Sequence, residues 1–478
     1  MNRNYFIQCS LISFSAWFIA GCQTVGPDYV APELVDYQDA WVAGDASVLA
    51  PGQVEATNYW EDFHDPLLNQ LLEQASLQNR SIAQAEAGYL AASASLDRAY
   101  RAIYPMGGVS TGVTRQQNSS ASFGADLPFE FEAQTTYTAG ANVSWESGLF
   151  GRIRSGLDQA IAGMGGQQAV LEDTRRAILA QTALNYLSLR ELNARIAVSQ
   201  ANLERQREVL TLTEQLREAG EVSDIDVERQ TNLVDSTLAG LSGLQAARQE
   251  TISGLALLTG QTVPDFQDTY PELIDGATDK LPELSAFGPL RIVSPEDMLR
   301  RRPDVRAAER QLAQSVYAIQ FATADLYPQL TLSGNVSLTA LEPGNLFTGD
   351  ALGYSFGPQL SWGVFNLSQT RALIDQREAE AESARQNFEN TVLTALTETD
   401  AALQSYNFGV EQAAISKRAL GSAERSRELV EIRYREGAES LLSLIDAQRQ
   451  ALSAQDAEIQ ARFEALRRRV TVYRALGG

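Results

Sequence analysis

The residue with the clearest chemistry in this sequence is Cys22, which directly follows Ile19-Ala20-Gly21. Small residues before a cysteine are typical of signals that are cleaved at that cysteine, whose sulfur then carries a lipid. Met1–Gly21 fits such a signal, since Arg3 lies near its start and the apolar run 11–20 follows. That run is too short to span a bilayer comfortably. We therefore favour lipidation of Cys22 over a transmembrane anchor or a signal peptide without a lipid.

Other reactive residue types are scarce. Cys9 lies inside the signal, so the mature chain has no second cysteine for a disulfide or a metal site. His64 is the only histidine, and we expect it to pack or to cap a helix rather than to bind a ligand. The net charge of −22 disfavours nucleic acid as a partner. We therefore expect no enzyme activity, no metal and no cofactor beyond the covalent lipid on Cys22.

Several short motifs in the rest of the sequence occur twice. Tyr104-Pro105 matches Tyr327-Pro328 at an offset of 223, and Trp145 matches Trp362 at an offset of 217. This internal repeat and the segments between its copies suggest five parts. They are a signal peptide at 1–21, a lipidated tether at 22–65, a first repeat at 66–260, an equatorial linker at 261–295 and a second repeat at 296–478.

Each repeat contains two segments in which apolar and polar residues alternate. They lie at 107–114 (weakly) and 135–147 in the first copy, and at 330–339 and 354–362 in the second. Such alternation suits transmembrane strands, although a soluble sheet with one buried face shows it too. The export signal favours transmembrane strands over a soluble sheet. Because four strands cannot close a barrel and a membrane excludes open sheet edges, several chains would have to share one barrel.

Very long helices are predicted after each strand pair, at about 152–219 and 369–436, because proline is absent from both. At 1.5 Å per residue each would reach about 100 Å. Another helix is predicted from Pro66 to about Ile103. Apolar residues recur every seven positions, which indicates coiled-coil packing. In the first copy they are Leu189, Ile196, Leu203 and Leu210.

Both long helices end in the same pattern. Gly220 and Gly437 suit the left-handed position after a helix C-terminus. Ser223 and Ser440 follow as N-caps of returning helices, so each copy should end in a tight helical hairpin. The arginines Arg300–Arg302 precede a proline. We expect them to form a surface at a helix start rather than a site for nucleic acid or anionic lipid.

Several motifs, taken in order, resemble one known family. They are Val25-Gly26-Pro27-Asp28-Tyr29, Leu149-Phe150-Gly151-Arg152, Arg301–Arg306 and Leu444–Arg449. Their order and spacing resemble the outer-membrane efflux factors of the TolC family, in its lipoprotein OprM/NodT branch. Essentially the whole mature chain takes part in the resemblance.

The resemblance implies a mainly α fold with a small β part. Three chains would form a 12-stranded outer-membrane β-barrel, with four strands per chain, continuous with a long periplasmic α-helical barrel. It also implies a homotrimer that works with a periplasmic adaptor and an inner-membrane pump of the RND type, and expels small molecules across the bacterial outer membrane. The alternatives are a duct for type I protein or peptide secretion, and a structural coiled-coil lipoprotein of the envelope.

The resemblance further implies a gate at the second hairpin, made by rings of Leu442 and Asp446. Ser443 stands where some relatives carry a second aspartate. A ring of carboxylates would favour cations, and a leucine ring could block the passage by dewetting. Without the resemblance, Asp446 could equally be a solvated helix residue that pairs with Arg449.

Two further roles follow from the resemblance. Asp226 and Tyr434 match positions that hold neighbouring hairpins together, and Asp226 could complete a capping box with Ser223 in place of that role or in addition to it. The hairpin turns are the expected docking tips for an adaptor, although tight turns use Gly and Ser anyway. These tip residues are Gly220, Ser223, Gly437 and Ser440.

Overall fold

The computed structural model describes residues 24–33, 40–42, 49–51, 59–119, 132–274 and 289–477. It divides into two compact units. The first comprises residues 1–32, 88–167 and 307–388, and the second comprises 33–87, 168–306 and 389–478. Each unit takes segments from both sequence repeats, so the repeats are not separate globular domains.

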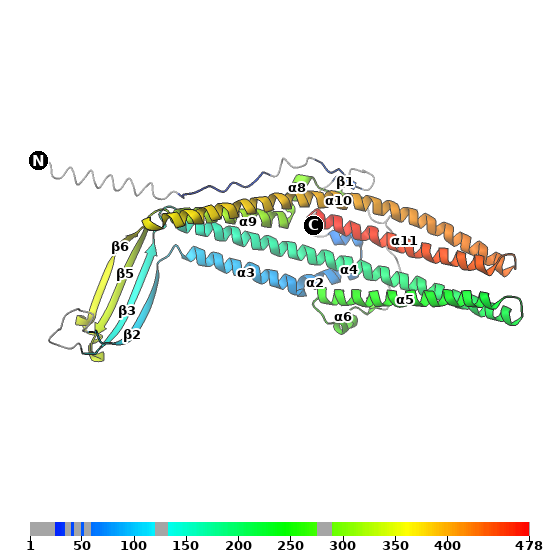
Figure 1. The fold of residues 1–478 in the computed structure, drawn as a ribbon, viewed down its shortest axis with the longest axis horizontal. Coiled ribbons are helices and arrows are strands. Elements are labelled where there is room, and N and C mark those ends of the chain that lie inside the picture. Colours follow the sequence, from blue (N-terminus) through cyan, green and yellow to red (C-terminus); the bar gives the residue numbers. More distant parts are fainter. Residues whose placement is uncertain are drawn as a thin grey trace. The chain divides into compact units, whose positions relative to one another are not determined.

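The first unit contains a four-stranded antiparallel sheet in the order β2-β3-β5-β6 (Figure 1). Its strands are β2 (Met106–Gln116), β3 (Gln134–Glu146), β5 (Gln329–Ala340) and β6 (Leu352–Ser361). The two central strands come from different repeats. Asn142 of β3 lies opposite Asn335 of β5 and, on its other side, Gly108 of β2. Four strands at the predicted places are confirmed, and this register sets which side chains share a face.

The long helices are also confirmed. α4 (Arg152–Glu218) has 67 residues and α10 (Leu367–Arg435) has 69. Each is followed by a returning helix of 35 residues, α5 (Asp224–Leu258) and α11 (Leu441–Ala475). In the described part of the chain, none of the helices has a stretch apolar enough to cross a membrane.

In the second unit, the seven-residue repeat produces the predicted coiled-coil contact. Ile196 and Leu203 of α4 are buried against Val234 and Leu241 of α5. α10 and α11 meet through small residues at Ala413, Ala461 and Ala465. Nearer the hairpin they also meet through large side chains, since Val430 and Tyr434 of α10 pack against the cluster that contains Leu441, Leu444 and Ile445.

The structure has two helices where the sequence predicted one. The segment from Pro66 forms α2 (Pro66–Gln78) and α3 (Arg80–Arg101), with an extended residue, Asn79, between them. Asn79 Oδ1 accepts hydrogen bonds from the first amides of α3, and its Nδ2 donates to Leu258 O at 2.9 Å. The break was missed because a contact with a distant helix end creates it.

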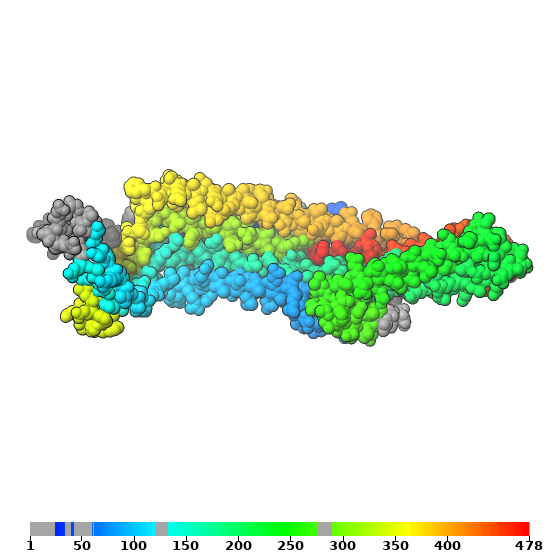
Figure 2. All heavy atoms as spheres, turned by 60° about the horizontal axis from the view of Figure 1, so that its bottom comes forward, coloured from blue at the N-terminus to red at the C-terminus, as the bar shows by residue number. Residues whose placement is uncertain are grey.

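The remaining elements are short. α9 (Pro303–Ala324) precedes β5 as α3 precedes β2. The predicted linker contains α6 (Val263–Thr269), α7 (Pro271–Ile274) and β4 (Leu290–Ile292), and α8 (Pro295–Arg301) follows. α6 packs on α5, and both lie at the surface shown in Figure 2. The others are β1 (Leu49–Pro51), which pairs in parallel with β4, and the 3-10 turns Tyr59–Phe63, Pro343–Asn345, Gly349–Ala351 and Val364–Asn366.

Candidate functional site

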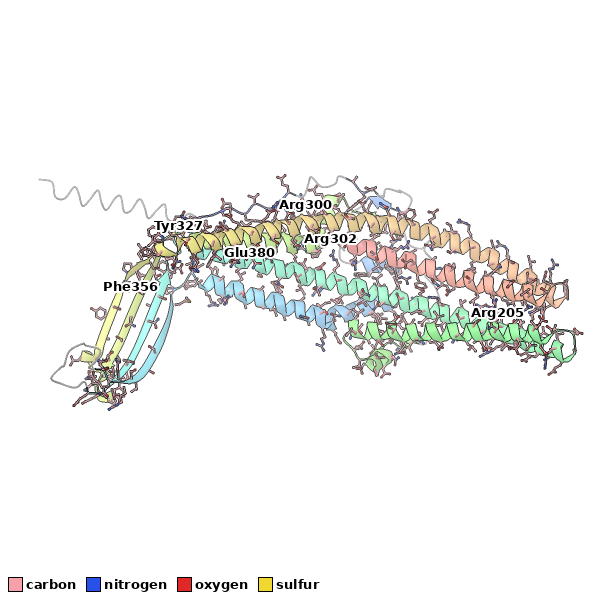
Figure 3. The ribbon with its side chains drawn as sticks, viewed as in Figure 1. Arg205, Arg300, Arg302, Tyr327, Phe356 and Glu380 are labelled. Carbon is pink, nitrogen blue, oxygen red and sulfur yellow. The ribbon has the colours of Figure 1, made fainter. Side chains whose placement is uncertain are left out.

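The sheet has an apolar face that no other part of its unit covers. Tyr354 and Phe356 of β6 lie on this face and are 82% and 73% exposed, and Figure 3 shows Phe356 standing out from the strand. The register adds Val109, Val113, Val143 and Val336 to the same face. An exposed apolar surface that runs across four strands is unusual for a soluble protein and is typical of contact with lipid.

The opposite face of the sheet carries small, uncharged polar residues. Between the strand ends these are Ser110, Thr114, Thr136, Thr138, Asn142, Ser144, Thr331, Ser333, Asn335, Ser337, Thr339, Ser355 and Gln359, with glycines among them. Among the described strand residues of this face, Glu146 at the end of β3 is the only charged one. This face can therefore line a water-filled passage without attracting ions of one sign.

The two repeats anchor the sheet by equivalent hydrogen bonds. Trp145 Nε1 at the end of β3 donates to Ile103 O at 2.8 Å. Trp362 Nε1, just after β6, donates to Leu326 O at 3.1 Å. Each carbonyl lies in the short connection between a helix and the strand that follows it. An indole that is apolar on its faces and polar at its edge suits a membrane interface.

An arginine joins the two repeats at the same end of the sheet. Arg152 Nη1 lies 3.2 Å from Glu146 Oε2, and its Nε lies 3.1 Å from Asp325 Oδ1. Its guanidinium lies over the Phe321 ring, 4.6 Å from the centroid. These bonds hold the first turn of α4 against the end of α9, so the junction between sheet and helices is braced by charge as well as by packing.

The two hairpin turns of the second unit have one geometry. Gly220 and Gly437 have φ of 83° and 70°, in the left-handed region that favours glycine. The following amides reach back into the helix, from Glu221 N to Leu216 O at 2.9 Å and from Ala438 N to Arg433 O at 2.8 Å. The predicted turns and glycine positions are therefore confirmed, while docking at them stays a prediction.

The N-caps of the returning helices differ. In the first copy, Asp226 Oδ2 accepts from Ser223 N at 3.1 Å and from Ser223 Oγ at 2.8 Å, which is the predicted capping box. In the second copy, Ser440 Oγ accepts from Ser443 N at 3.2 Å. Ser443 thus belongs to the cap of α11, a role that an aspartate at this position could share.

The structure does not bring Asp226 and Tyr434 into a hydrogen bond within the chain. The Asp226 carboxylate serves the cap, and the buried Tyr434 hydroxyl has no hydrogen-bond partner among the described residues. Burial raises the pKa of Tyr434, the neighbouring Thr213 side chain lowers it by a smaller amount, and the charge of Asp226 makes a still smaller contribution that raises it. The latch between neighbouring hairpins therefore stays a prediction.

The two proposed gate residues share the exposed side of α11. Leu442 is 49% exposed and Asp446 is exposed one turn later, while Leu441, Leu444 and Ile445 are buried together with Leu233 of α5. In the described residues, Asp446 forms no ion pair with Arg449, but its exposure fits a solvated helix residue as well as a gate residue, so the gate stays a prediction. One face of α11 is packed against other helices, and the side that carries Leu442 and Asp446 is exposed.

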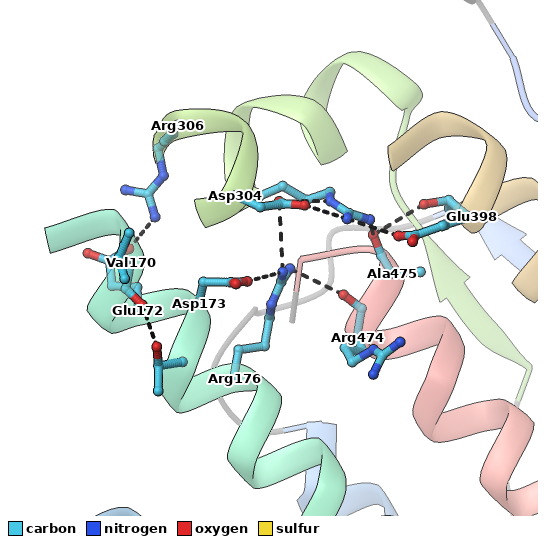
Figure 4. A network of polar contacts seen from close by, with 12 residues as sticks. Val170, Glu172, Asp173, Arg176, Asp304, Arg306, Glu398, Arg474 and Ala475 are labelled. Carbon is cyan, nitrogen blue, oxygen red and sulfur yellow. Dashed lines mark hydrogen bonds and ion pairs between the residues drawn. The ribbon is translucent and has the colours of Figure 1, made fainter. Parts of the chain in front are cut away.

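A buried polar network holds the other end of α11 (Figure 4). Arg302 is 4% exposed. Its guanidinium donates to Asp304 Oδ2 at 2.6 Å, Glu398 Oε2 at 3.2 Å and Ala475 O at 3.0 Å. Arg176 of α4 donates to Arg474 O at 3.2 Å. Two cations thus satisfy carbonyls at a helix C-terminus, where positive charge is favourable.

This network corrects the interpretation of Arg300–Arg302 as a surface. Only Arg300 behaves as expected, pairing with Glu296 at the exposed side of α8. Arg302 is the C-cap of α8 and points inward. The sequence gives no sign of this, because a buried arginine and a solvated one look alike until their partners are known.

His64 neither packs nor caps. It is exposed, has φ of 48° and places Nδ1 2.8 Å from Asp62 O. The cap of α2 is Asp65, whose Oδ1 accepts from Leu67 N at 3.1 Å. No group of side chains suited to hold a metal occurs in the described part of the chain. Cys22 lies outside the described residues.

Comparisons with known proteins agree on one kind of relative. A family model described as outer membrane efflux protein matches residues 71–261 and 294–478, once for each repeat. The pyoverdine export outer membrane protein OpmQ of Pseudomonas aeruginosa is 30% identical over 437 residues, 90% of each chain. The antibiotic efflux pump outer membrane protein ArpC of Pseudomonas putida is 29% identical, over 98% of this chain and 94% of its own.

A solved structure has the same fold. The outer-membrane channel OprN superimposes with a TM-score of 0.85 at 33% identity, over 95% of this chain and 99% of its own.

Proposed function

Since the chain belongs to the outer membrane efflux protein family, a family of channels, we propose that three copies form one gated, passive exit duct through the outer membrane. The function as an outer-membrane efflux channel and the location in the outer membrane follow from the family and the relatives. The copy number, the gate, the partners and the exported compound are the parts that we propose.

The observation that carries this proposal is the four-stranded sheet with one lipid-suited face and two free edges. In the described residues, the outer edges of β2 and β6 pair with no other strand. A membrane does not tolerate unpaired backbone groups in contact with lipid. Pairing β2 of one copy with β6 of the next satisfies both edges, and three copies supply twelve strands, enough for a barrel.

The helices supply the periplasmic part of the duct and its gate. We place the narrowest point at Leu442 and Asp446, because both lie on the exposed side of α11 next to the second hairpin turn. Opening would move this end of α11, whose other end is held by Arg302 and Arg176. Asp226 and Tyr434 would connect neighbouring hairpins in the closed state.

The duct would act with a periplasmic adaptor at its hairpin tips and with an inner-membrane pump of the RND type. Small-molecule export is preferred over peptide secretion, because the names of the relatives refer to pyoverdine export and to antibiotic efflux. A passive duct needs no catalytic group and no cofactor. The lipid on Cys22 would anchor the N-terminus.

The copy number can be tested by native mass spectrometry of the mature protein released from detergent. The proposal predicts three chains in each particle and, for each chain, a mass that includes the lipid. A Cys22→Ser variant should lack the lipid and keep the copy number. Single chains in both samples would refute the shared barrel.

A further inference from the structure

The first unit contains an open groove beside the start of β2. It has a volume of about 780 Å³ and is formed by the end of α3, the connection to β2, the start of α4 and one residue of α9. Its lining is mostly apolar and includes Ala99, Ala102, Tyr104, Pro105 and Met106. The Tyr104 and Met106 side chains are more than half exposed, so within one chain the groove is not filled.

Among the described residues, the most exposed aromatic side chain lies just after the other edge strand. Phe365, in the 3-10 turn Val364–Asn366, is 98% exposed. Trp362 and Val364 beside it are also exposed. A fully exposed phenylalanine next to further apolar side chains is typical of a surface that another molecule covers.

The register places these two features at the same end of the sheet. Met106 lies opposite Ser144, Ser144 opposite Ser333, and Ser333 opposite Gly357 of β6. The start of β2 and the end of β6 at Ser361 therefore lie toward the same end of the sheet, with β6 continuing past the level of Met106. If β6 of one copy pairs with β2 of the next, the two strands run antiparallel like all others in the sheet. The turn after β6 then arrives beside the groove before β2.

We propose that this groove is a socket for Phe365 of the neighbouring copy of the chain. The inference rests on the proposed function, since it requires copies arranged side by side in a closed ring. It adds a specific contact below the strands, where a buried aromatic ring fixes the strand register between copies. Each copy offers one Phe365 side chain and one groove. All three contacts therefore form only when three copies close into a circle.

Within one chain the contact is not possible. β2 and β6 are separated by two strands, and three spacings of about 4.8 Å amount to about 14 Å. A disulfide needs Cα atoms within about 7 Å. Cysteines placed at the groove and at the aromatic turn can therefore link only different chains. Cleavage of the signal would remove Cys9, and the sulfur of Cys22 would carry the lipid. The engineered cysteines would then be the only free thiols.

The test is oxidative cross-linking of the full-length protein in membranes, with Ala102→Cys and Phe365→Cys in the same chain. The expected result is a covalent trimer on a denaturing gel, and neither single variant should give one. Leu90→Cys with Phe365→Cys is the matched control. Leu90 is exposed on α3, about 17 Å before the end of that helix at Arg101, and should not cross-link.

A second measurement tests the contact without relying on the two cysteines being placed correctly for a disulfide. Phe365→Ala should lower the temperature at which the trimer dissociates. Phe347→Ala, which removes another exposed ring (82% exposed) from the connection before β6 at the far end of the sheet, should not. An intact trimer that does not cross-link and is insensitive to Phe365→Ala would overturn the socket and leave a lipid chain as its occupant. A wild-type protein that is never trimeric would instead refute the proposed function.

Discussion

Removing the Arg302 guanidinium should release the C-terminal end of α11. Four hydrogen bonds join it to Asp304, Glu398 and Ala475 O. Arg302→Ala leaves two carboxylates facing each other and one helix-terminal carbonyl with fewer donors. Removing one partner of a buried charge pair costs about 3–5 kcal/mol.

For Arg302→Ala we expect a cost at or below the lower end of that range. Arg302 itself is buried, but the Asp304 and Glu398 side chains are 28% and 55% exposed, so water compensates part of the loss. We expect about 2–3 kcal/mol, which corresponds to a roughly 30- to 150-fold rise in local opening. Arg302→Lys should recover only part of it, because an ammonium cannot bind a carboxylate in the bidentate manner of a guanidinium.

Hydrogen exchange of the last turns of α11, followed by mass spectrometry, measures this opening directly. Arg300→Ala is the matched control, since it removes an exposed ion pair worth at most about 1 kcal/mol. Unchanged exchange of α11 in Arg302→Ala, or an equal effect in Arg300→Ala, would refute the reasoning.

The same network predicts a pH dependence. Burial alone would raise the pKa of Asp304, but the hydrogen bonds and charge of Arg302 outweigh it and hold that pKa below its usual value. A carboxyl group whose pKa is lower when folded stabilises the protein above its unfolded pKa of about 3.9. This stabilisation is lost as the pH falls through the folded pKa. The difference in thermal stability between wild type and Arg302→Ala should therefore shrink below about pH 4.

Three further changes test other parts of the structure. Asp446→Ala should increase basal conductance in planar bilayers and uptake of a large antibiotic by cells, and the gate assignment fails if neither changes. Gly437→Ala should destabilise the second hairpin by about 1–2 kcal/mol, because φ is 70° there. Gly240→Ala, in a helix with open space around it, should stabilise that helix by about 0.5–1 kcal/mol. Hydrogen exchange of the hairpin amides distinguishes the two glycine variants. Trp145→Phe and Trp362→Phe should each cost about 1 kcal/mol in thermal stability, and unequal costs would show that the two anchors are not equivalent.

The sequence predicted those elements whose cause is local. Alternation placed the strands, the absence of proline placed α4 and α10, and Gly437 with Ser440 marked a turn whose dihedral angles only glycine adopts easily. The capping box at Ser223 and Asp226 was predicted because its spacing alone defines it. The heptad residues Ile196 and Leu203 were predicted because their partners lie on a neighbouring helix at the same period.

The sequence did not reveal features whose cause is a distant partner. Asn79 breaks a helix through its contact with Leu258, and asparagine inside a helical pattern gives little warning of that. Arg302 was taken for a surface residue because its three partners come from α9, α10 and α11. The pairing of β3 with β5 joins the repeats across 183 residues or more, as the bond from Ser147 to Leu330 shows, and no local pattern specifies it.

The central claim is that this chain supplies part of a water-filled passage through the outer membrane. Electrical recording of the purified mature protein in planar lipid bilayers tests it most directly. The account predicts discrete conductance steps that grow when Asp446 is replaced by alanine. A protein that inserts into the bilayer and never passes current, in the wild type or in that variant, would contradict it.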